Sequence, residues 1–123
     1  MGTKIEAADH ADAIVAKLGA ALADPASAFT LLVRFQARAG MEADVESAFA
    51  AVRGDTLREP GALAFDLNRA TADATRFVVY ERWRSLDHFA AHIRKPSVGV
   101  LRDRLGALID GMPEFDILRP AAE

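Results

Sequence analysis

The sequence contains no cysteine, and this absence excludes several kinds of chemistry. Without a thiol the chain forms no disulfide, has no thiolate nucleophile and offers no thiolate ligand to a metal. An excess of basic residues is also missing, because 18 acidic residues outweigh 15 lysines and arginines and give a formal net charge of −3. A nucleic-acid partner requires a basic surface, so this charge balance argues against one.

Long hydrophobic runs are missing as well. No stretch approaches the roughly 18 consecutive apolar residues that a membrane-spanning helix needs, so we expect no membrane partner. The N-terminal segment is interrupted by Glu6, Asp9, Asp12 and Lys17, unlike the apolar centre of a secretory signal. The expected location is therefore the cytoplasm. The chain has 123 residues, of which 51% are apolar, and this suffices for one domain with a sizeable core.

The N-terminal part, residues 1–28, is expected to form a helix and a linker. Apolar side chains recur at helical spacing between residues 4 and 23, and Asp24-Pro25 ends the pattern. The apolar stripe is rich in alanine and therefore thin. We expect this helix to lie on the surface of the main fold or to cross to a partner chain.

The rest of the pattern, residues 29–119, predicts one α+β domain. Alternation predicts strands at 29–36, 63–68, 76–84 and 115–117, and helical spacing predicts helices at 41–57, 86–93 and 97–110. Ser85 can cap the second of these helices, and Gly111 and Pro113 are expected to stop the last one. The order β-α-β-β-α-β is that of the ferredoxin-like fold, a four-stranded antiparallel sheet with helices on one face.

The sheet face without helices needs another cover. The alternation places on it a mixture of apolar and polar side chains: Thr30, Leu32, Arg34, Ala64, Asp66, Val78, Tyr80 and Arg82. Leu32, Val78 and Tyr80 are poorly suited to contact with water. Pairing this face with the same face of a second subunit hides them, so the pattern predicts a two-fold homodimer.

Glu81 has the most unusual position in the pattern. It shares one face of the strand at 76–84 with three apolar residues: Phe77, Val79 and Trp83. Burial disfavours a charge, so an inward carboxylate has a raised pKa and can give or take a proton near neutral pH. The alternative is a structural role, in an ion pair with an arginine or as an acceptor for backbone N–H groups at the start of the next helix. Structural networks perturb carboxylates as readily as active sites do.

Aromatic and histidine side chains lie near this acid in the sequence. Trp83 and Phe65 could form an aromatic wall for a flat substrate, or they could simply fill the core. His88 and His92 are spaced i, i+4, which is compatible with a metal site. A third ligand and the H-E-x-x-H pattern are missing, so we expect no metal.

Three segments of the domain resemble the antibiotic biosynthesis monooxygenase superfamily. They are Arg58-Glu59-Pro60-Gly61-Ala62-Leu63-Ala64-Phe65, Arg76-Phe77-Val78-Val79-Tyr80-Glu81-Arg82-Trp83, and His88-Phe89-Ala90-Ala91-His92 followed by Pro96. The combination of an E-P-G turn, an F-x-x-Y-E-x-W strand and an H-x-x-x-P helix end is more specific for the fold than for the reaction. The resemblance covers about residues 29–119. It implies a dimeric α+β barrel with a pocket in each subunit between sheet and helices.

Small quinol and anthrone monooxygenases are among the members of this superfamily. The resemblance therefore implies a reaction without a cofactor, in which an electron-rich phenol or enol is deprotonated and its anion reacts directly with O2. The expected partners are O2 and a quinol-like or polyketide-like small molecule. The nucleotide-cofactor motifs G-x-G-x-x-G and G-x-x-x-x-G-K-[ST] are missing from the sequence, so we expect no cofactor.

The resemblance suggests a role for His92, and the strand pattern suggests roles for the other candidate residues. His92 matches a histidine that members often carry, and its neutral pKa suits removal of a phenol proton, so it is the candidate base. Glu81 and Trp83 are expected to complete the catalytic group. Phe65, Tyr80 and Arg34 are the expected substrate-binding residues. Tyr80 and Arg34 fall on the other sheet face in this register, where a dimer interface is the alternative, unless a one-residue bulge reverses them.

Other functions stay open at this point. Haem-degrading relatives ligate iron through a histidine on the later helix, but the predicted helix 97–110 contains no histidine. An isomerase of a small phosphorylated metabolite would need cations, which Arg94, Lys95 and Arg102 could supply. In a non-catalytic dimeric ligand-binding or stress module, the acid and the histidine would be structural.

Overall fold

The computed structural model of the protein describes residues 7–121. Its elements follow in the order α1 (Ala7–Ala21), β1 (Phe29–Ala37), α2 (Glu42–Leu57), β2 (Ala62–Arg69), β3 (Arg76–Trp83), α3 (Leu86–Ile93), α4 (Pro96–Leu108) and β4 (Ile109–Leu118). The predicted order of strands and helices and the additional N-terminal helix are confirmed. Residues 4–6 of the predicted first helix lie outside the described residues. None of the described helices is long and apolar enough to cross a bilayer.

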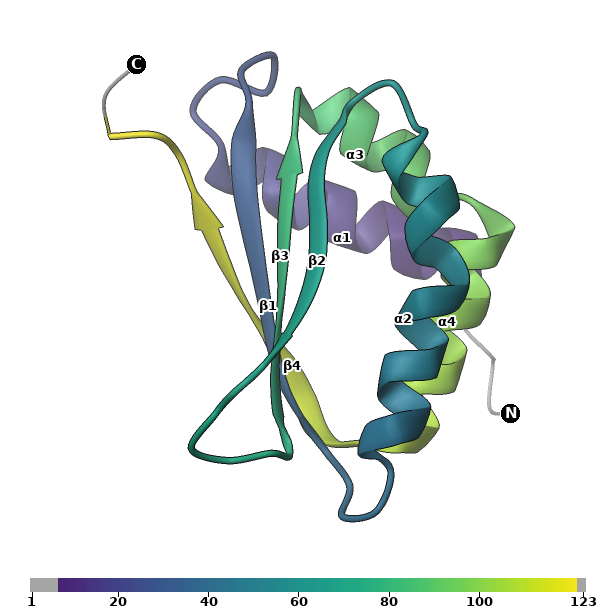
Figure 1. Ribbon diagram of the computed structural model, residues 1–123. Coiled ribbons are helices and arrows are strands. Elements are labelled where there is room, and N and C mark those ends of the chain that lie inside the picture. Colours follow the sequence, from purple (N-terminus) through teal and green to yellow (C-terminus); the bar gives the residue numbers. More distant parts are fainter. Residues whose placement is uncertain (1–6, 122–123) are drawn as a thin grey trace.

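The strands form one antiparallel sheet in the order β2-β3-β1-β4, and the helices lie on one side of it (Figure 1). We call the helix-covered side the inner face and the opposite side the outer face. β1 and β3 pair without a shift, so Leu31 lies opposite Glu81 and Phe35 lies opposite Phe77. Directly opposed residues point to the same side of a sheet. Glu81 therefore lies on the inner face, as the alternation predicted.

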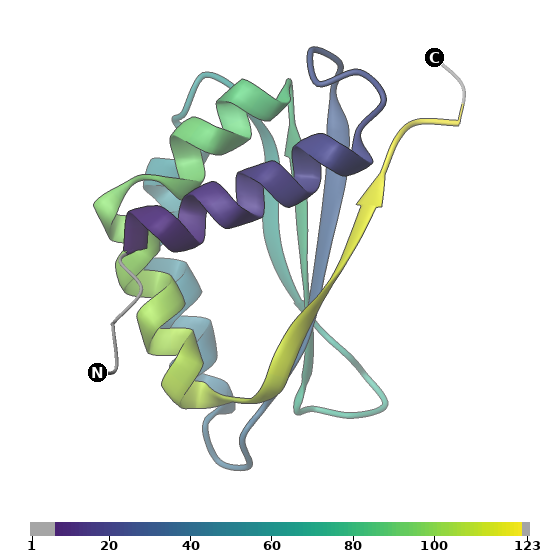
Figure 2. The same cartoon turned by 180° about the vertical axis from the view of Figure 1, so that it is seen from behind.

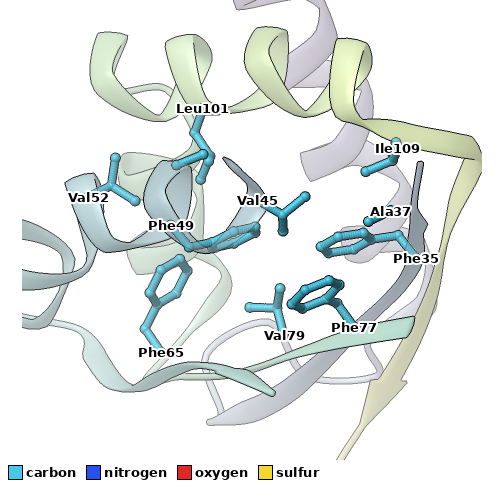
Figure 3. Close-up of a cluster of buried hydrophobic side chains, with 11 residues drawn as sticks. Phe35, Ala37, Val45, Phe49, Val52, Phe65, Phe77, Val79, Leu101 and Ile109 are labelled. Atoms are coloured by element: carbon cyan, nitrogen blue, oxygen red, sulfur yellow. The ribbon is translucent and has the colours of Figure 1, made fainter. Parts of the chain in front are cut away.

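The part of the inner face below α2 and α4 is an aromatic core (Figure 3). The Phe35 ring stacks on Phe49 and on Phe77, with ring centroids 6.0 Å and 5.6 Å apart and interplanar angles of 9° and 12°. Phe65 lies beside Phe49, with centroids 6.2 Å apart. All four rings are buried. Aromatic pairs of this kind contribute about 0.5–1.5 kcal/mol each beyond their area burial, so this part of the face chiefly supplies stability.

The part of the inner face below α1 and α3 is built around Trp83. The Trp83 side chain is 0% exposed, and its ring meets Phe89 edge-on with centroids 6.0 Å apart. Leu18 of α1 and Leu22 just after it belong to the same buried cluster. Figure 2 shows α1 crossing the end of the sheet at which α3 lies. The N-terminal helix therefore packs on the main fold of its own chain, which was one of the two predicted positions.

The C-terminal strand is longer than predicted. α4 ends at Leu108, and β4 begins at once with Ile109, whose φ of −114° and ψ of 156° are extended. The predicted helix 97–110 and its stop at Gly111 and Pro113 were therefore wrong at this boundary. Gly111 adopts a φ of 69° where the pairing with β1 shifts. Pro113 is tolerated because β4 is an edge strand, where a missing N–H removes no ladder bond to an outer neighbour.

β2 departs from the predicted alternation at its start. Ala62 and Ala64 pair with consecutive residues of β3, so Leu63 between them is the extra residue of a bulge. Its side chain is 38% exposed, whereas the alternation placed it on the inner face together with Phe65. The bulge directly follows the Glu59-Pro60-Gly61 turn and ends the regular pairing there.

The outer face mixes ion pairs with partly exposed apolar side chains. Arg34 Nε lies 3.1 Å from Asp116 Oδ2. Tyr80 is 38% exposed and Leu118 is 44% exposed. The helices leave this face uncovered (Figure 1), so the predicted need for a partner surface stays a prediction.

Candidate active site

Glu81 lies in the middle of the inner face. The row of residues across the sheet consists of Phe65 on β2, Glu81 on β3, Leu31 on β1 and Ile117 on β4. Phe65 belongs to the aromatic core and Leu31 to the Trp83 cluster, so the acid lies at the junction of the two. It is 7% exposed. Its carboxylate Oε1 accepts a hydrogen bond of 3.0 Å from Trp83 Nε1.

Burial raises the pKa of Glu81 from 4.5 to about 7, because the charged form loses its hydration. The hydrogen bond from Trp83 opposes this rise, and the negative charge of Glu59 adds to it. Across residues 7–121 no arginine or lysine lies within ion-pair distance of Glu81, so the arginine pair left open by the sequence does not form there. A group with this pKa can donate or accept a proton at neutral pH.

His92 packs its ring against the same aromatic side chains. The ring centroid lies 4.6 Å from that of Trp83, 5.6 Å from Phe65 and 6.3 Å from Phe89. His92 Nδ1 lies 3.1 Å and 3.2 Å from the two carboxylate oxygens of Glu59. Burial lowers the pKa of His92, and the bond to Glu59 counteracts this effect in part. A neutral His92 donates its Nδ1–H to Glu59, which leaves Nε2 as the proton acceptor.

Glu59 is the functional candidate that the sequence analysis missed. Its side chain is only 9% exposed, and its Oε2 also lies 3.3 Å from Lys95 Nζ. In the sequence this residue is distinguished only as the first position of the E-P-G turn. In the structure it orients His92, favours the protonated imidazole and raises the pKa of Glu81. Glu59 thus contacts His92 and Lys95 directly, and its charge also acts on Glu81.

The turn glycine makes this arrangement possible. A Cβ added at Gly61 would lie 2.1 Å from both Cβ and Cγ of His88, which is far inside contact distance. The absence of a side chain at this position therefore lets the turn approach α3 closely enough for Glu59 to reach His92. His88 Nδ1 forms a hydrogen bond of 2.8 Å with Ser85 Oγ. The same oxygen accepts a hydrogen bond from the backbone N–H of His88 and so caps α3. The predicted capping role of Ser85 is confirmed, and His88 lies apart from the Glu81 centre.

Two surface pockets are lined in part by residues of α3, and His88 belongs to both. One has a volume of about 350 Å³ and is lined by Glu59, Gly61, His88 and Lys95 among others. The other has a volume of about 690 Å³ and includes Asp24, Leu63, Ser85 and His88. Glu81 and Trp83 line neither of them. The first pocket connects Glu59 with solvent, whereas the inner side of the site is closed by packed side chains.

The other predicted site residues fall into two groups. Phe65 lies beside His92 and is also part of the aromatic core, so its role as a wall for a substrate stays a prediction. Tyr80 and Arg34 lie on the outer face, because no bulge interrupts the pairing of β1 with β3. Their assignment to substrate binding stays a prediction, and the structure does not bring them together with the buried cluster. Among the described residues no group of three or more histidine, aspartate or glutamate side chains could hold a metal ion.

The sequence model of the antibiotic biosynthesis monooxygenase family matches residues 28–104 of this chain. This match spans more than half of the chain, which therefore belongs to that family. It contains the three segments that carried the predicted resemblance. The helix α1 lies before the matched region. No curated protein matches the sequence.

Solved structures agree with this assignment. A proposed antibiotic biosynthesis monooxygenase from Nitrosomonas europaea is 22% identical with a TM-score of 0.74, over 81% of this chain and 96% of that chain. The Rv0793 protein from Mycobacterium tuberculosis is 24% identical with a TM-score of 0.73, over 79% and 98%. PA3566 from Pseudomonas aeruginosa is 22% identical with a TM-score of 0.72, over 80% and 98%. At these identities the likeness shows the fold alone, and it confirms the ferredoxin-like architecture.

Proposed function

We propose that this protein is a monooxygenase that oxidises an electron-rich phenolic, quinol or polyketide-like molecule with O2 and without a cofactor. One observation carries the proposal: a buried acid with a pKa of about 7 is bonded to Trp83 at 3.0 Å. The same aromatic surroundings hold His92, which is paired with Glu59. Family membership supports the reaction class, and the site supplies the groups that the reaction needs.

The first step of the proposed reaction is removal of a proton. His92 Nε2 accepts a proton from a phenol or an acidic C–H group of the substrate, and Glu59 stabilises the imidazolium through Nδ1. The aromatic walls exclude water, which keeps the substrate anion reactive toward O2. The pocket that Glu59 and Lys95 line gives the abstracted proton a route to solvent.

The second step joins the anion to oxygen. The substrate anion gives electrons to O2, a new carbon–oxygen bond forms, and the resulting hydroperoxide loses water to leave a carbonyl. One oxygen atom enters the product and the other leaves as water. For a methylene carbon, the two hydrogens that are lost supply the electrons, so no external reductant is needed. Neutral Glu81 is the hydrogen-bond donor and proton source for the departing oxygen.

A homodimer is part of the proposal. Family membership supports it, because a pair of subunits can bury the uncovered outer face. Tyr80 at the centre of that face is 38% exposed in the single chain. Replacing Tyr80 by glutamate places a charge in the proposed interface, and sedimentation analysis is expected to show dissociation to monomers. The expected cytoplasmic location stays a prediction.

The experiment is an oxygen-electrode screen of the purified protein against quinols and anthrones without added cofactor. The expected result is O2 uptake that falls at least a hundredfold in Glu81→Gln and His92→Gln, in line with the loss of an acid–base group. Glu46→Gln and His10→Gln are matched controls at exposed positions and retain activity. A folded protein that binds such aromatics and consumes no O2 with any of them is a ligand-binding module and contradicts the proposal.

The phosphorylated-metabolite alternative has less support. Arg94 is paired with Asp12 over 3.0 Å, and Lys95 is paired with Glu59. Arg102 donates to the carbonyl oxygen of Ile93 over 2.9 Å. Each of the three cations that this function would need is therefore engaged with the protein itself.

A further inference from the structure

The proposed active site is closed on its inner side. Trp83 is 0% exposed and His92 is 2% exposed, and Leu31, the neighbour of Glu81 on β1, is 1% exposed. A substrate needs direct contact with His92 Nε2 and with O2 at the same time. Some element that covers this face therefore has to move before a substrate can bind.

α1 is the covering element with the fewest buried contacts. It is 15 residues long, and among its side chains that the structure describes only Ala11 and Leu18 are buried. α2 has nearly the same length, 16 residues, and buries five of them: Val45, Ala48, Phe49, Val52 and Thr56. α1 lies outside the part of the chain that matches the family, residues 28–104. The matched region contains β1, α2, β2, β3 and α3 and most of α4.

Apolar side chains between α1 and the sheet are partly exposed to solvent. Val33 and Ile117, both on the inner face, are only half-buried, and Phe115 on the same face is 36% exposed. Ile14 and Val15 of α1 are half-buried beside the same cluster. Apolar side chains are thus partly open to solvent on both sides of the boundary between α1 and the sheet, which is where a cover that moves would separate from the sheet.

Besides the buried side chains of Leu18 and Leu22, two exposed contacts hold α1 in place. Asp12 Oδ1 lies 3.0 Å from Arg94 Nη2 at the end of α3. Lys17 Nζ lies 5.9 Å from the centroid of the Phe115 ring on β4. Contacts between exposed charges are weak because water competes with them, so both can open without a large penalty.

From these observations we propose that α1 is a movable wall of a binding site for flat aromatic ligands. The ligand lies on the apolar surface that α1 covers, formed by Phe29 and Leu31 of β1, Trp83 of β3 and Phe89 of α3. Leu18 and Leu22 occupy this surface when α1 is closed. The class of ligand and the need for a cover to move rest on the proposed function, whereas the choice of α1 as the element that moves rests on its packing.

A reversible lock on α1 tests this inference. A Cβ added at Gly19 would lie 3.3 Å from Leu86 Cδ2, so α1 and α3 approach each other closely at this point. Cysteines are placed at both positions, and the loss of free thiols on oxidation shows that a disulfide joins the two helices. The natural chain has no cysteine, so this bond would be the only disulfide. The probe is 1,8-dihydroxyanthraquinone, and binding is followed by quenching of the single tryptophan, Trp83.

The expected result is at least tenfold weaker probe binding to the oxidised Gly19→Cys/Leu86→Cys protein than to the same protein after reduction. Acrylamide quenching of Trp83 should decrease in parallel. The single variants Gly19→Cys and Leu86→Cys are controls and should show no dependence on the reductant. Asp12→Ala removes one exposed contact and should increase acrylamide quenching.

Equal acrylamide quenching in the locked and reduced proteins overturns the inference, whether or not the probe binds. The outcome is also separable from that of the proposed function. Gated probe binding without O2 uptake supports the movable wall and contradicts the monooxygenase. Full O2 uptake by the locked protein supports the monooxygenase and contradicts the movable wall.

Discussion

The two parts of the inner sheet face differ in what they bury. Under α2 and α4 the interior is apolar, with the rings of Phe35, Phe49 and Phe77 stacked in a row. Toward α1 and α3 it includes Glu81, at the junction of the two parts, and His92 of α3, and both groups lose hydration on burial. Buried ionisable groups lower stability unless they are fully paired. Under the proposed function, the first part holds the fold together and the second supplies the acid–base groups.

The largest expected effect is in the apolar part. Phe77→Ala removes a fully buried ring that stacks on Phe35, and we expect a loss of about 3–5 kcal/mol in the free energy of unfolding. Urea denaturation followed by Trp83 fluorescence measures it. Val100→Ala, at a position 58% exposed, is the control and should stay within about 0.5 kcal/mol. A loss below about 1 kcal/mol for Phe77→Ala would remove the contrast between the two parts.

In the polar part, Glu81→Gln is expected to increase stability at high pH. The folded protein holds the Glu81 proton up to a pKa of about 7, whereas the unfolded chain releases it near 4.5. Wild-type stability therefore decreases as pH rises between these values, and the full penalty, on the order of 3 kcal/mol, is present above pH 7. Glutamine keeps an acceptor for Trp83 and carries no charge.

The measurement for Glu81→Gln is the unfolding free energy at pH 4 and at pH 8. The variant should exceed the wild type at pH 8 and match it at pH 4. Glu46→Gln removes only an exposed pair with Arg69, 3.5 Å apart, and should change each value by less than about 1 kcal/mol. A gain of the same size at both pH values would show that Glu81 is not buried as a neutral acid.

Glu59→Leu tests the pair that holds His92. The change leaves the buried Nδ1–H without an acceptor, and we expect a loss of about 1–3 kcal/mol at pH 7. Because Glu59 raises the pKa of His92, its removal should lower that pKa further. In the unfolded chain a histidine binds a proton below about pH 6.5, whereas folded His92 binds one only at lower pH. The free energy of unfolding of Glu59→Leu should therefore decrease more steeply in acid than that of the wild type.

Histidine titration by NMR and denaturation at pH 5 and 7 measure the effects of Glu59→Leu. Glu59→Gln retains an acceptor oxygen and is the matched comparison, with a smaller loss of stability. An unchanged His92 pKa in Glu59→Leu would mean that the two side chains do not interact in solution.

The smallest expected effect concerns the helix that presents His92. Ser85→Ala removes the oxygen that caps α3 and should cost about 1 kcal/mol. Ser85→Asp keeps a capping oxygen and should restore most of the loss. Thermal unfolding of the three proteins gives the ranking, and equal midpoints would show that the cap contributes nothing.

The inward position of Glu81 was predictable because alternation along one strand decides it. The pairing of β1 with β3 has no bulge, so the pattern needed no correction. The contact between Glu59 and His92 was not predictable, because it joins residues 33 apart through the packing of a turn against a helix. The only signal in the sequence was the Glu59-Pro60-Gly61 turn itself, and turn residues are usually exposed to solvent.

Two further features depend on tertiary structure in the same way. Gly111 and Pro113 predict a helix end locally, and only the position of β4 at the sheet edge makes them acceptable within a strand. The thin apolar stripe of α1 predicts a helix on a surface, but nothing in it specifies which surface. Its position over Trp83 became known only from the packing.

The hydrogen bond between Trp83 and Glu81 makes tryptophan fluorescence sensitive to the protonation state of Glu81. Light absorption displaces electron density within an indole, so a charge appearing 3.0 Å from its nitrogen changes the colour and yield of the emission. Glu81 has a pKa of about 7, so the fluorescence of this sole tryptophan should change near that pH. The pKa of His92, whose ring lies 4.6 Å from the indole, is lowered, so its titration should affect the emission at lower pH. The protonation state of the buried acid can thus be followed in the intact protein before any substrate is known.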